Sequence, residues 1–154
     1  MEIISNSVEK TQDIAGQLVR EIIAKKSAKK NGAYAIALSG DLGSGKTAFI
    51  QGVAYALGVK EKVLSPTFLL MRSFGLGKDG EGQRAPFSSM YHFDFYRLGN
   101  PKDVLDLGYE EVMENNDHLV VMEWADRFKQ LIPKDAVWVN LEWLAPDKRK
   151  ISVK

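Results

Sequence analysis

The stretch best suited to chemistry is residues 40–47, which read Gly-Asp-Leu-Gly-Ser-Gly-Lys-Thr and match the phosphate-binding pattern G-x-x-x-x-G-K-[ST]. Glycines allow such a loop to turn its backbone N–H groups inward, so that Lys46 reaches the outer phosphates and the Thr47 hydroxyl can bind Mg²⁺. The other loop residues predicted to contact the phosphates are Asp41, Leu42, Gly43, Ser44 and Gly45. The pattern therefore predicts a site for a nucleoside triphosphate with Mg²⁺.

The sequence on either side of the loop supports this interpretation. Residues 33–39 are apolar enough for a buried strand, and residues 48–57 form an apolar helical segment that stops at Gly58. A helix that begins at the loop adds its partial positive charge to the site. A glycine-rich turn that carries Lys-Thr by chance is the alternative, and the order strand, loop, helix favours the phosphate site.

Two carboxylates are candidates for the acidic part of the site. Glu123 follows the apolar run 119–122, and Asp94 lies in the alternating segment 89–97. A buried parallel strand can deliver such a carboxylate to the phosphate edge of a sheet. We expect Glu123 to bind Mg²⁺ with Thr47, directly or through water, and Asp94 to orient or activate the attacking water. Which carboxylate binds the metal directly stays open, and either could instead cap a loop.

Three further features near the predicted site have more than one interpretation. His92 is more often a satisfied structural histidine than a proton carrier, because phosphoryl transfer needs little proton chemistry from the protein. Trp124 can pack against the nucleotide, against a partner or in the core. Pro66 stiffens the turn that holds Ser65 and Thr67, which is either a switch that senses the γ-phosphate or the entry into an apolar strand.

The composition bounds the size and setting of the protein. A length of 154 residues suits a single domain over 1–154, and 45% hydrophobic with 27% charged residues is ordinary for a globular protein. No apolar run approaches the ~18 residues of a membrane span and no signal peptide is visible, so we expect a cytoplasmic protein. The absence of cysteine excludes thiolate chemistry, and a net charge of +1 means that nucleic-acid contact would need a local basic patch.

The remaining pattern predicts an α/β protein with a three-layer P-loop NTPase fold, in which a mainly parallel sheet carries antiparallel edge strands. Ser7 is a plausible cap for a first helix, and Asn100-Pro101 is typical of a helix start. The glycine-rich residues 75–86 predict a loop between two strands, and residues 136–153 predict a closing hairpin.

Four segments in this order make the sequence resemble a known family. Residues 40–47, 65–68 (Ser-Pro-Thr-Phe), 92–98 (His-Phe-Asp-Phe-Tyr-Arg-Leu) and 123–127 (Glu-Trp-Ala-Asp-Arg) look like the motifs of the TsaE family, also called YjeE. Many families share the phosphate loop, but H-x-D-x-Y-R followed by E-W is specific. The resemblance runs from the first helix to the closing strands.

The resemblance implies an ATPase subunit of bacterial tRNA threonylcarbamoyladenosine synthesis that works with TsaB and TsaD. TsaD transfers the threonylcarbamoyl group to adenosine 37 of tRNA, and ATP hydrolysis by the TsaE subunit supports turnover, so tRNA would be met indirectly. The roles implied for this chain are phosphate contact by Lys46, Mg²⁺ binding by Thr47 and Glu123, hydrolysis through Asp94, and a switch at Thr67. Two departures are a phenylalanine at position 95, where the family usually has leucine, and a longer glycine-rich segment.

Without the resemblance, two other functions stay open. One is a stand-alone small-molecule kinase, although such enzymes usually need an acceptor pocket and an arginine-bearing lid, for which residues 75–86 offer only Arg84. The other is a nucleotide-gated binding module. The sequence carries no [NT]-K-x-D guanine signature, so ATP is expected rather than GTP.

Overall fold

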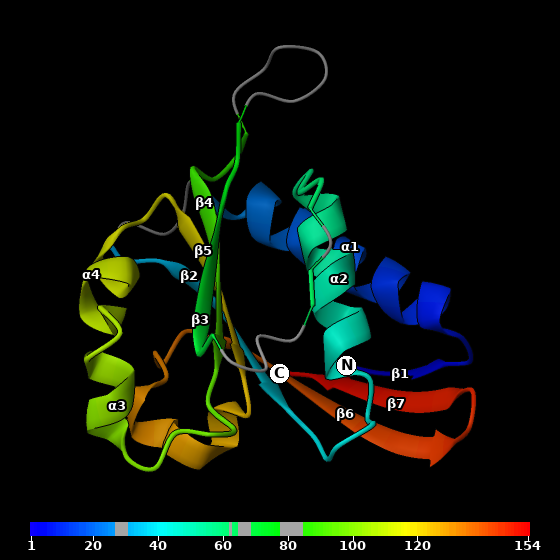
Figure 1. The fold of residues 1–154 in the computed structure, drawn as a ribbon. Coiled ribbons are helices and arrows are strands. Elements are labelled where there is room, and N and C mark those ends of the chain that lie inside the picture. The colour runs from blue at the N-terminus through cyan, green and yellow to red at the C-terminus, as the bar shows by residue number, and fades with distance from the viewer. Residues whose placement is uncertain (27–30, 62, 65–68, 78–84) are drawn as a thin grey trace.

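The computed structural model describes residues 1–26, 31–61, 63–64, 69–77 and 85–154. A seven-stranded sheet crosses the middle of the molecule, and helices cover both of its faces (Figure 1). The strands are β1 (Glu2–Ser5), β2 (Tyr34–Ser39), β3 (Met71–Gly75), β4 (Ser89–Asp94), β5 (His118–Glu123), β6 (Val137–Ala145) and β7 (Lys148–Val153). The helices are α1 (Val8–Ala24), α2 (Lys46–Ala56), α3 (Pro101–Leu105), α4 (Tyr109–Glu114) and the 3₁₀ segment η2 (Ala125–Leu131). Among these helices, none combines the length and the apolar character that a membrane crossing requires.

Four parallel strands form the centre of the sheet, whose order is β1-β7-β6-β2-β5-β4-β3. β2 pairs with β5 and β6, and β4 pairs with β5, all in parallel. β3 joins β4 at one edge, while β7 joins β6 and β1 joins β7 at the other, all in antiparallel fashion. The predicted α/β fold with antiparallel edge strands is confirmed, and both edges of the sheet carry such strands.

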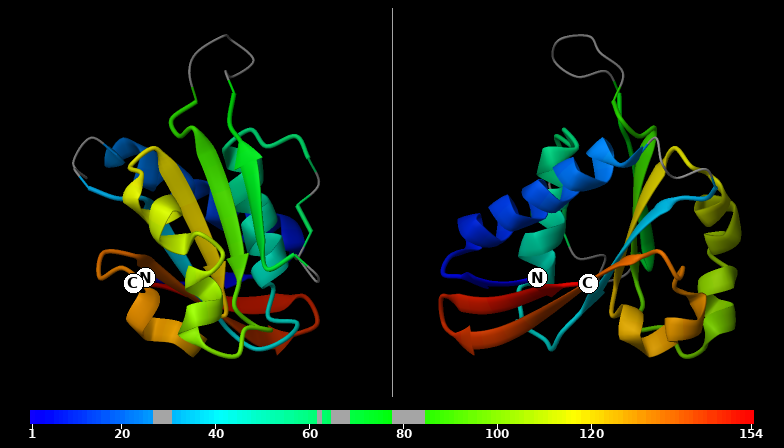
Figure 2. Two further views of the ribbon diagram at one scale, coloured as in Figure 1. Left: turned by 60° about the vertical axis from the view of Figure 1, so that its left-hand side comes forward. Right: turned by 180° about the vertical axis from the view of Figure 1, so that it is seen from behind.

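Two hydrophobic clusters lie on opposite faces of the sheet. α1 and α2 cover one face, and α3, α4 and η2 cover the other (Figures 1 and 2). Ile36 and Leu38 of β2 belong to the cluster with α1 and α2, whereas Ala35 and Ala37 belong to the other cluster. This alternation fixes the register of β2, and it therefore fixes where the loop after Ser39 begins.

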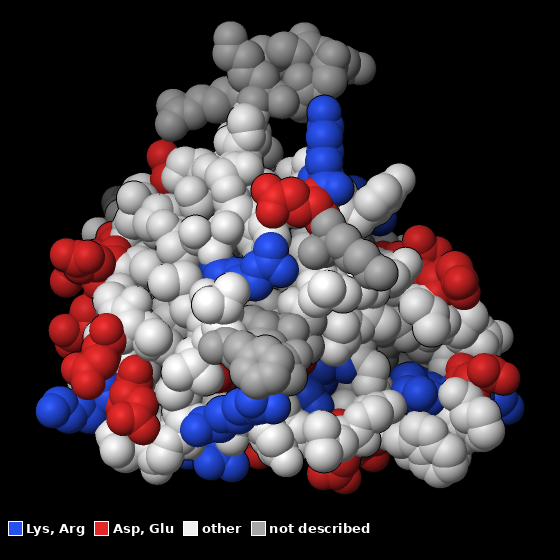
Figure 3. All heavy atoms as spheres, in the orientation of Figure 1, with Lys and Arg blue, Asp and Glu red and all other residues white. Residues whose placement is uncertain are grey.

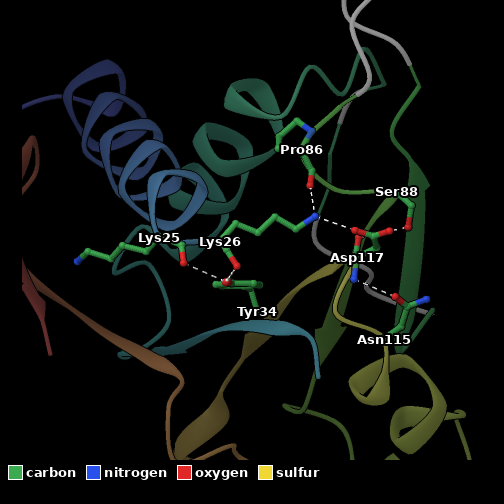
Figure 4. A network of polar contacts seen from close by, with 7 residues as sticks. All are labelled: Lys25, Lys26, Tyr34, Pro86, Ser88, Asn115 and Asp117. Atoms are coloured by element: carbon green, nitrogen blue, oxygen red, sulfur yellow. Dashed lines mark hydrogen bonds and ion pairs between the residues drawn. The ribbon is translucent and has the colours of Figure 1, made fainter. Parts of the chain in front are cut away.

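Lys26 ties the region beyond α1 to two loops (Figure 4). Its ammonium donates to the Asp117 carboxylate over 2.7 Å and to the carbonyl oxygen of Pro86, and it lies 4.8 Å from the centre of the Phe87 ring. The carbonyl oxygen of Asp117 accepts hydrogen bonds from the N–H and the hydroxyl of Ser88. Because Ser88 and Asp117 directly precede β4 and β5, the network holds the amino ends of these strands, opposite the end that carries the predicted site.

The contact between α1 and α2 leaves no room for a side chain at Gly52. A Cβ atom there would lie 2.5 Å from the carbonyl oxygen and 2.6 Å from the Cα atom of Gln12, both backbone atoms of α1. We expect Gly52→Ala to push the two helices apart and to lower the free energy of unfolding by about 1–3 kcal/mol. Urea unfolding followed by circular dichroism measures this loss.

Gly16 provides a matched control for the same pair of helices. A Cβ atom at Gly16 would meet its nearest neighbours, in Arg20 and Ala56, at 3.5 and 3.6 Å, which is ordinary van der Waals contact. Gly16→Ala should therefore stabilise α1, by up to about 1 kcal/mol through helix propensity. Equal destabilisation by both substitutions would show that close backbone contact at Gly52 is not the cause.

Candidate functional site

The loop 40–47 connects β2 to α2, and its glycines adopt conformations that other residues rarely take. Gly40 has a φ angle of 133°, and Gly45, which precedes α2, has a φ angle of 104°. A Cβ atom at Gly40 would lie 2.2 Å from the carbonyl oxygen of Leu141, so the backbone of β6 closes one side of the loop. No side-chain hydrogen bond caps the start of α2 in the described chain, which leaves its first N–H groups available to an anion.

Lys46 lies in the middle of this loop and is only 6% exposed. Its ammonium donates hydrogen bonds to the carbonyl oxygens of Gly40 and Asp41 over 2.6 and 2.9 Å, and it lies 3.5 Å from the Ser44 hydroxyl. The ammonium also lies 3.9 Å from the centre of the Trp124 ring, a distance typical of a cation–π contact. The loop therefore presents one buried cation to a ligand.

Acidic residues surround this cation. Burial lowers the pKa of Lys46, and the carboxylates of Glu123, Asp126, Asp41 and Asp94 act against that shift. Their negative charges favour the ammonium form at a position where water is largely excluded. The loop thus combines a buried positive charge with nearby carboxylates, which is the charge arrangement of a site for a phosphate and a metal ion.

The two predicted carboxylates lie on neighbouring strands at the same edge of the sheet. Asp94 ends β4 and is paired in register with Glu123, which ends β5 and is itself paired with Leu38 of β2. Asp94 is 8% exposed and Glu123 is 3% exposed. Because β2 leads into the phosphate loop two residues after Leu38, the topology brings both carboxylates to the edge where the loop begins.

The surroundings of Asp94 shift the pKa of its carboxyl group. Burial raises the pKa of Asp94, and the negative charge of neighbouring Glu123 raises it further. The backbone N–H of Tyr96 donates to Oδ1 over 3.0 Å, and this hydrogen bond opposes the shift. A carboxylate with a raised pKa holds a proton more readily than an exposed one. Burial and the neighbouring carboxylate therefore both favour the protonated form of Asp94, and its contact with a reacting water stays a prediction.

Within the described part of the chain, His92 makes one side-chain hydrogen bond and not two. Its Nε2 atom lies 2.9 Å from Oε2 of Glu123, while its Nδ1 atom is buried without a partner among the described residues. The histidine is buried and hydrogen-bonded as expected of a structural residue, but one of its ring nitrogens is not satisfied. The residue contacts a predicted site carboxylate, and sequence patterns did not indicate this contact.

Trp124 lies beside the phosphate loop and packs only partly against the core. Its backbone has a φ angle of 57°, which is the left-handed conformation and is rare for a bulky residue. Its ring contacts the Lys46 ammonium and stacks at a tilt on Tyr96, with 4.8 Å between the ring centres. Of the three interpretations made from the sequence, packing in the core holds in part, because Trp124 packs against the cluster that α3, α4 and η2 cover, and its contact with a nucleotide stays a prediction.

The indole of Trp124 should report nucleotide binding by fluorescence. Phosphate that draws the Lys46 ammonium toward itself changes the electric field at the ring 3.9 Å away. We expect a protein with Trp138 and Trp143 replaced by phenylalanine to change its emission when ATP is added. The same protein with Lys46→Ala is the control and should show no such change, whereas constant emission while calorimetry detects ATP binding would contradict this role for Trp124.

Two parts of the predicted site lie outside the described residues. These are the switch segment with Thr67 and most of the glycine-rich loop, residues 78–84. The apolar strand predicted to follow Thr67 begins only at Met71, and Leu69 is 62% exposed. The switch role of Thr67 stays a prediction.

Arg149 lies beside the phosphate loop, a position that the sequence did not indicate. Its side chain would contact a Cβ atom at Gly45 at 3.7 Å, and its guanidinium donates to the carbonyl oxygens of Ala145 and Pro146 over 2.8 and 3.1 Å. Its Nε atom is buried without a partner in the described part of the chain. An arginine in a closing strand carries no local signal of this position, because only the strand order brings β7 beside the loop.

Comparison with known families identifies one match over nearly the whole chain. The sequence model of the family described as "Threonylcarbamoyl adenosine biosynthesis protein TsaE" matches residues 5–151. The matched range includes the phosphate loop, Asp94, Glu123 and Arg149.

Individual proteins of this family name are also similar to the chain in sequence. A protein of Rickettsia conorii named "tRNA threonylcarbamoyladenosine biosynthesis protein TsaE" is 34% identical over 149 residues, covering 96% of this chain and 74% of that protein. The protein of the same name from Haemophilus influenzae is 30% identical over 139 residues, covering 90% and 79%. Among solved structures, Bacillus subtilis YdiB superposes with a TM-score of 0.65 over 99% of this chain and 83% of that one, at 22% identity, which supports the fold.

Proposed function

Because the chain belongs to the TsaE family of threonylcarbamoyl adenosine biosynthesis proteins, we propose that it binds ATP with Mg²⁺ at residues 40–47 and hydrolyses it. The observation that carries this proposal is the meeting of the buried Lys46 with Asp94 and Glu123 at one edge of the sheet. Hydrolysis of a γ-phosphate needs a phosphate cradle, a metal ion and a group that orients water. The site offers residues suited to each task.

The residues fit a Mg²⁺ ion that is shared with phosphate. Thr47, at the start of α2, supplies a hydroxyl, and Glu123 ends the strand beside the loop strand. In the part of the chain that the structure describes, no group of three or more His, Asp and Glu side chains is arranged to hold a metal. Mg²⁺ at phosphate sites commonly uses one or two protein oxygens together with water and phosphate oxygens, so Thr47 and Glu123 would suffice. When bound, the ion neutralises charge on the phosphate oxygens.

Lys46 and Asp94 have different roles in the proposed reaction. Lys46 would exchange its bonds to the loop carbonyls for bonds to the outer phosphates, where its compact charge stabilises the transition state. Asp94 would hold the attacking water through its carboxylate, because it lies beside Glu123 and its pKa is raised by burial. Arg149 adds a further positive charge next to the loop.

We further propose that this hydrolysis supports TsaB and TsaD in the cytoplasm, where TsaD transfers the threonylcarbamoyl group to adenosine 37 of tRNA. tRNA would be met through the complex. The net charge of +1 gives little general attraction for a polyanion, and acidic residues gather on the side of α3 and α4 (Figure 3). Such a surface disfavours contact with a phosphate backbone at that side.

A binding experiment with TsaB and TsaD tests this function. The tagged protein should retain the pair in a pull-down more strongly with ATP than without it, and the pair should stimulate ADP formation. Lys46→Ala is the matched control and should retain the pair equally with and without ATP. A kinase would be favoured instead if ADP formed only when a small-molecule acceptor was added and TsaB and TsaD had no effect on it.

A further inference from the structure

His92 and Glu123 form a buried pair whose histidine has no part in the roles given above. His92 lies on β4 with 0% of its surface exposed, and its Nε2 atom is 2.9 Å from Oε2 of Glu123 on the adjacent strand β5. Its Nδ1 atom has no hydrogen-bond partner in the described chain. The ring is therefore held at one polar atom, and that atom contacts the carboxylate proposed to bind Mg²⁺.

This contact determines which nitrogen of a neutral His92 ring carries the proton. An ionised carboxylate only accepts hydrogen bonds, so Nε2 must donate to Glu123. A proton on Nδ1 would leave that N–H buried without an acceptor, and it would also remove the donor from Glu123. The neutral ring is therefore expected to carry its proton on Nε2.

The second histidine of the chain has the opposite arrangement. The Nδ1 atom of His118, at the start of β5, lies 2.9 Å from the carbonyl oxygen of Val112, which can only accept. His118 therefore carries a proton on Nδ1. Since the sequence holds only two histidines, the NMR signals of each ring can be compared with those of the other in the same protein.

We propose that His92 is a positioning residue for Glu123, whose Oε2 it holds through the Nε2 proton so that Oε1 stays available to Mg²⁺ or to a water bound to it. The inference rests on the proposed ATPase function and deepens it. Without the donor, Glu123 keeps a buried carboxylate oxygen unsatisfied and can rotate or move to find another partner. Partners that orient metal ligands in this way typically change metal affinity by about 10–100-fold when removed.

Two substitutions separate the hydrogen bond from the packing. His92→Phe keeps a planar ring in the buried space but removes the donor, whereas His92→Gln removes the ring and keeps an N–H donor at a similar reach. Calorimetry measures ATP affinity with Mg²⁺ and with EDTA for each protein. We expect the gain in affinity that Mg²⁺ gives the wild type to fall by about 10-fold or more in His92→Phe and to return in part in His92→Gln. Affinity in EDTA should not change.

His118→Phe is the matched control. It removes the other histidine of the chain at the opposite end of β5, so its Mg²⁺ effect should equal that of the wild type. A Mg²⁺ effect of wild-type size in a folded His92→Phe protein would overturn the proposal. A wild-type protein that binds no ATP would instead contradict the proposed function, and the two failures are therefore distinguishable.

Nitrogen NMR of the wild-type histidine rings tests the inference without any ligand. In their neutral forms, one ring should be protonated on Nε2 and the other on Nδ1, and the Nε2–H signals should vanish in His92→Gln. This measurement can overturn the proposal even where His92→Phe does not fold. A spectrum in which His92 carries its proton on Nδ1 would show that it does not donate to Glu123.

Discussion

Replacement of Lys46 by alanine is expected to abolish ATP hydrolysis and to weaken ATP binding while the fold stays intact. Lys46 is only 6% exposed, and its ammonium lies among the carbonyl oxygens of the loop, where its charge is poorly screened by water. Removal of one such preorganised group commonly costs about 10²–10³-fold in rate. Calorimetry and a phosphate-release assay measure the two effects, and circular dichroism checks the fold.

Lys10→Ala is a suitable control for this prediction, because Lys10 is an exposed lysine on α1. It should bind and hydrolyse ATP as the wild type does. Lys46→Arg should restore little activity, since a planar guanidinium does not replace a compact ammonium in a closed loop. Wild-type ATP affinity in Lys46→Ala would remove the phosphate loop from the proposed mechanism.

Substitution of the two site carboxylates should separate hydrolysis from metal binding. We expect Asp94→Asn to bind Mg²⁺-ATP normally and to lose turnover by about 10²-fold or more, because the group that orients the water is lost. Glu123→Gln should instead lose the Mg²⁺-dependent part of ATP affinity. Calorimetry with and without Mg²⁺, combined with the rate of phosphate release, distinguishes the two variants. The reverse pattern would mean that the roles of Asp94 and Glu123 are exchanged.

Asp94→Asn also has an expected effect on stability. Because burial raises the pKa of Asp94 in the folded state, the folded protein binds more protons than the unfolded chain between the two pKa values. The free energy of unfolding therefore falls as the pH rises through that window. At neutral pH the asparagine variant should unfold at the same or a higher urea concentration than the wild type, so that lost turnover cannot be attributed to unfolding.

Features that depend on neighbouring residues could be predicted from the sequence. Ser7 accepts the N–H of Lys10 and caps α1, and Asn100 and Asp103 form a capping box around the start of α3. The phosphate loop is equally local, because its glycines and lysine are set by spacing alone. The placement of Glu123 and Asp94 at one edge of the sheet could also be predicted, since each ends a strand and parallel strands end at the same edge, while their roles stay predictions.

Features that depend on strand order could not be predicted. Nothing local shows that β7 lies between β1 and β6, yet this order brings Arg149 next to Gly45. The bond between His92 and Glu123 likewise needs β4 and β5 to be neighbours in the observed register. The strand expected after Thr67 begins only at Met71, and the exposure of the apolar Leu69 is not visible in its hydrophobicity.

The phosphate loop closes against residues that follow it by about a hundred positions. The Ser39 hydroxyl donates to Asn140 across 101 residues of sequence, and Gly40 packs on the carbonyl oxygen of Leu141. To form contacts between residues so far apart in the sequence, the chain must first lose the entropy of closing a long loop. Such contacts therefore slow folding. We therefore expect the phosphate loop to be completed late in folding, when β6 docks on β2. A ligand of this loop is then expected to bind the native state and not partly folded chains, so that it slows unfolding without speeding folding.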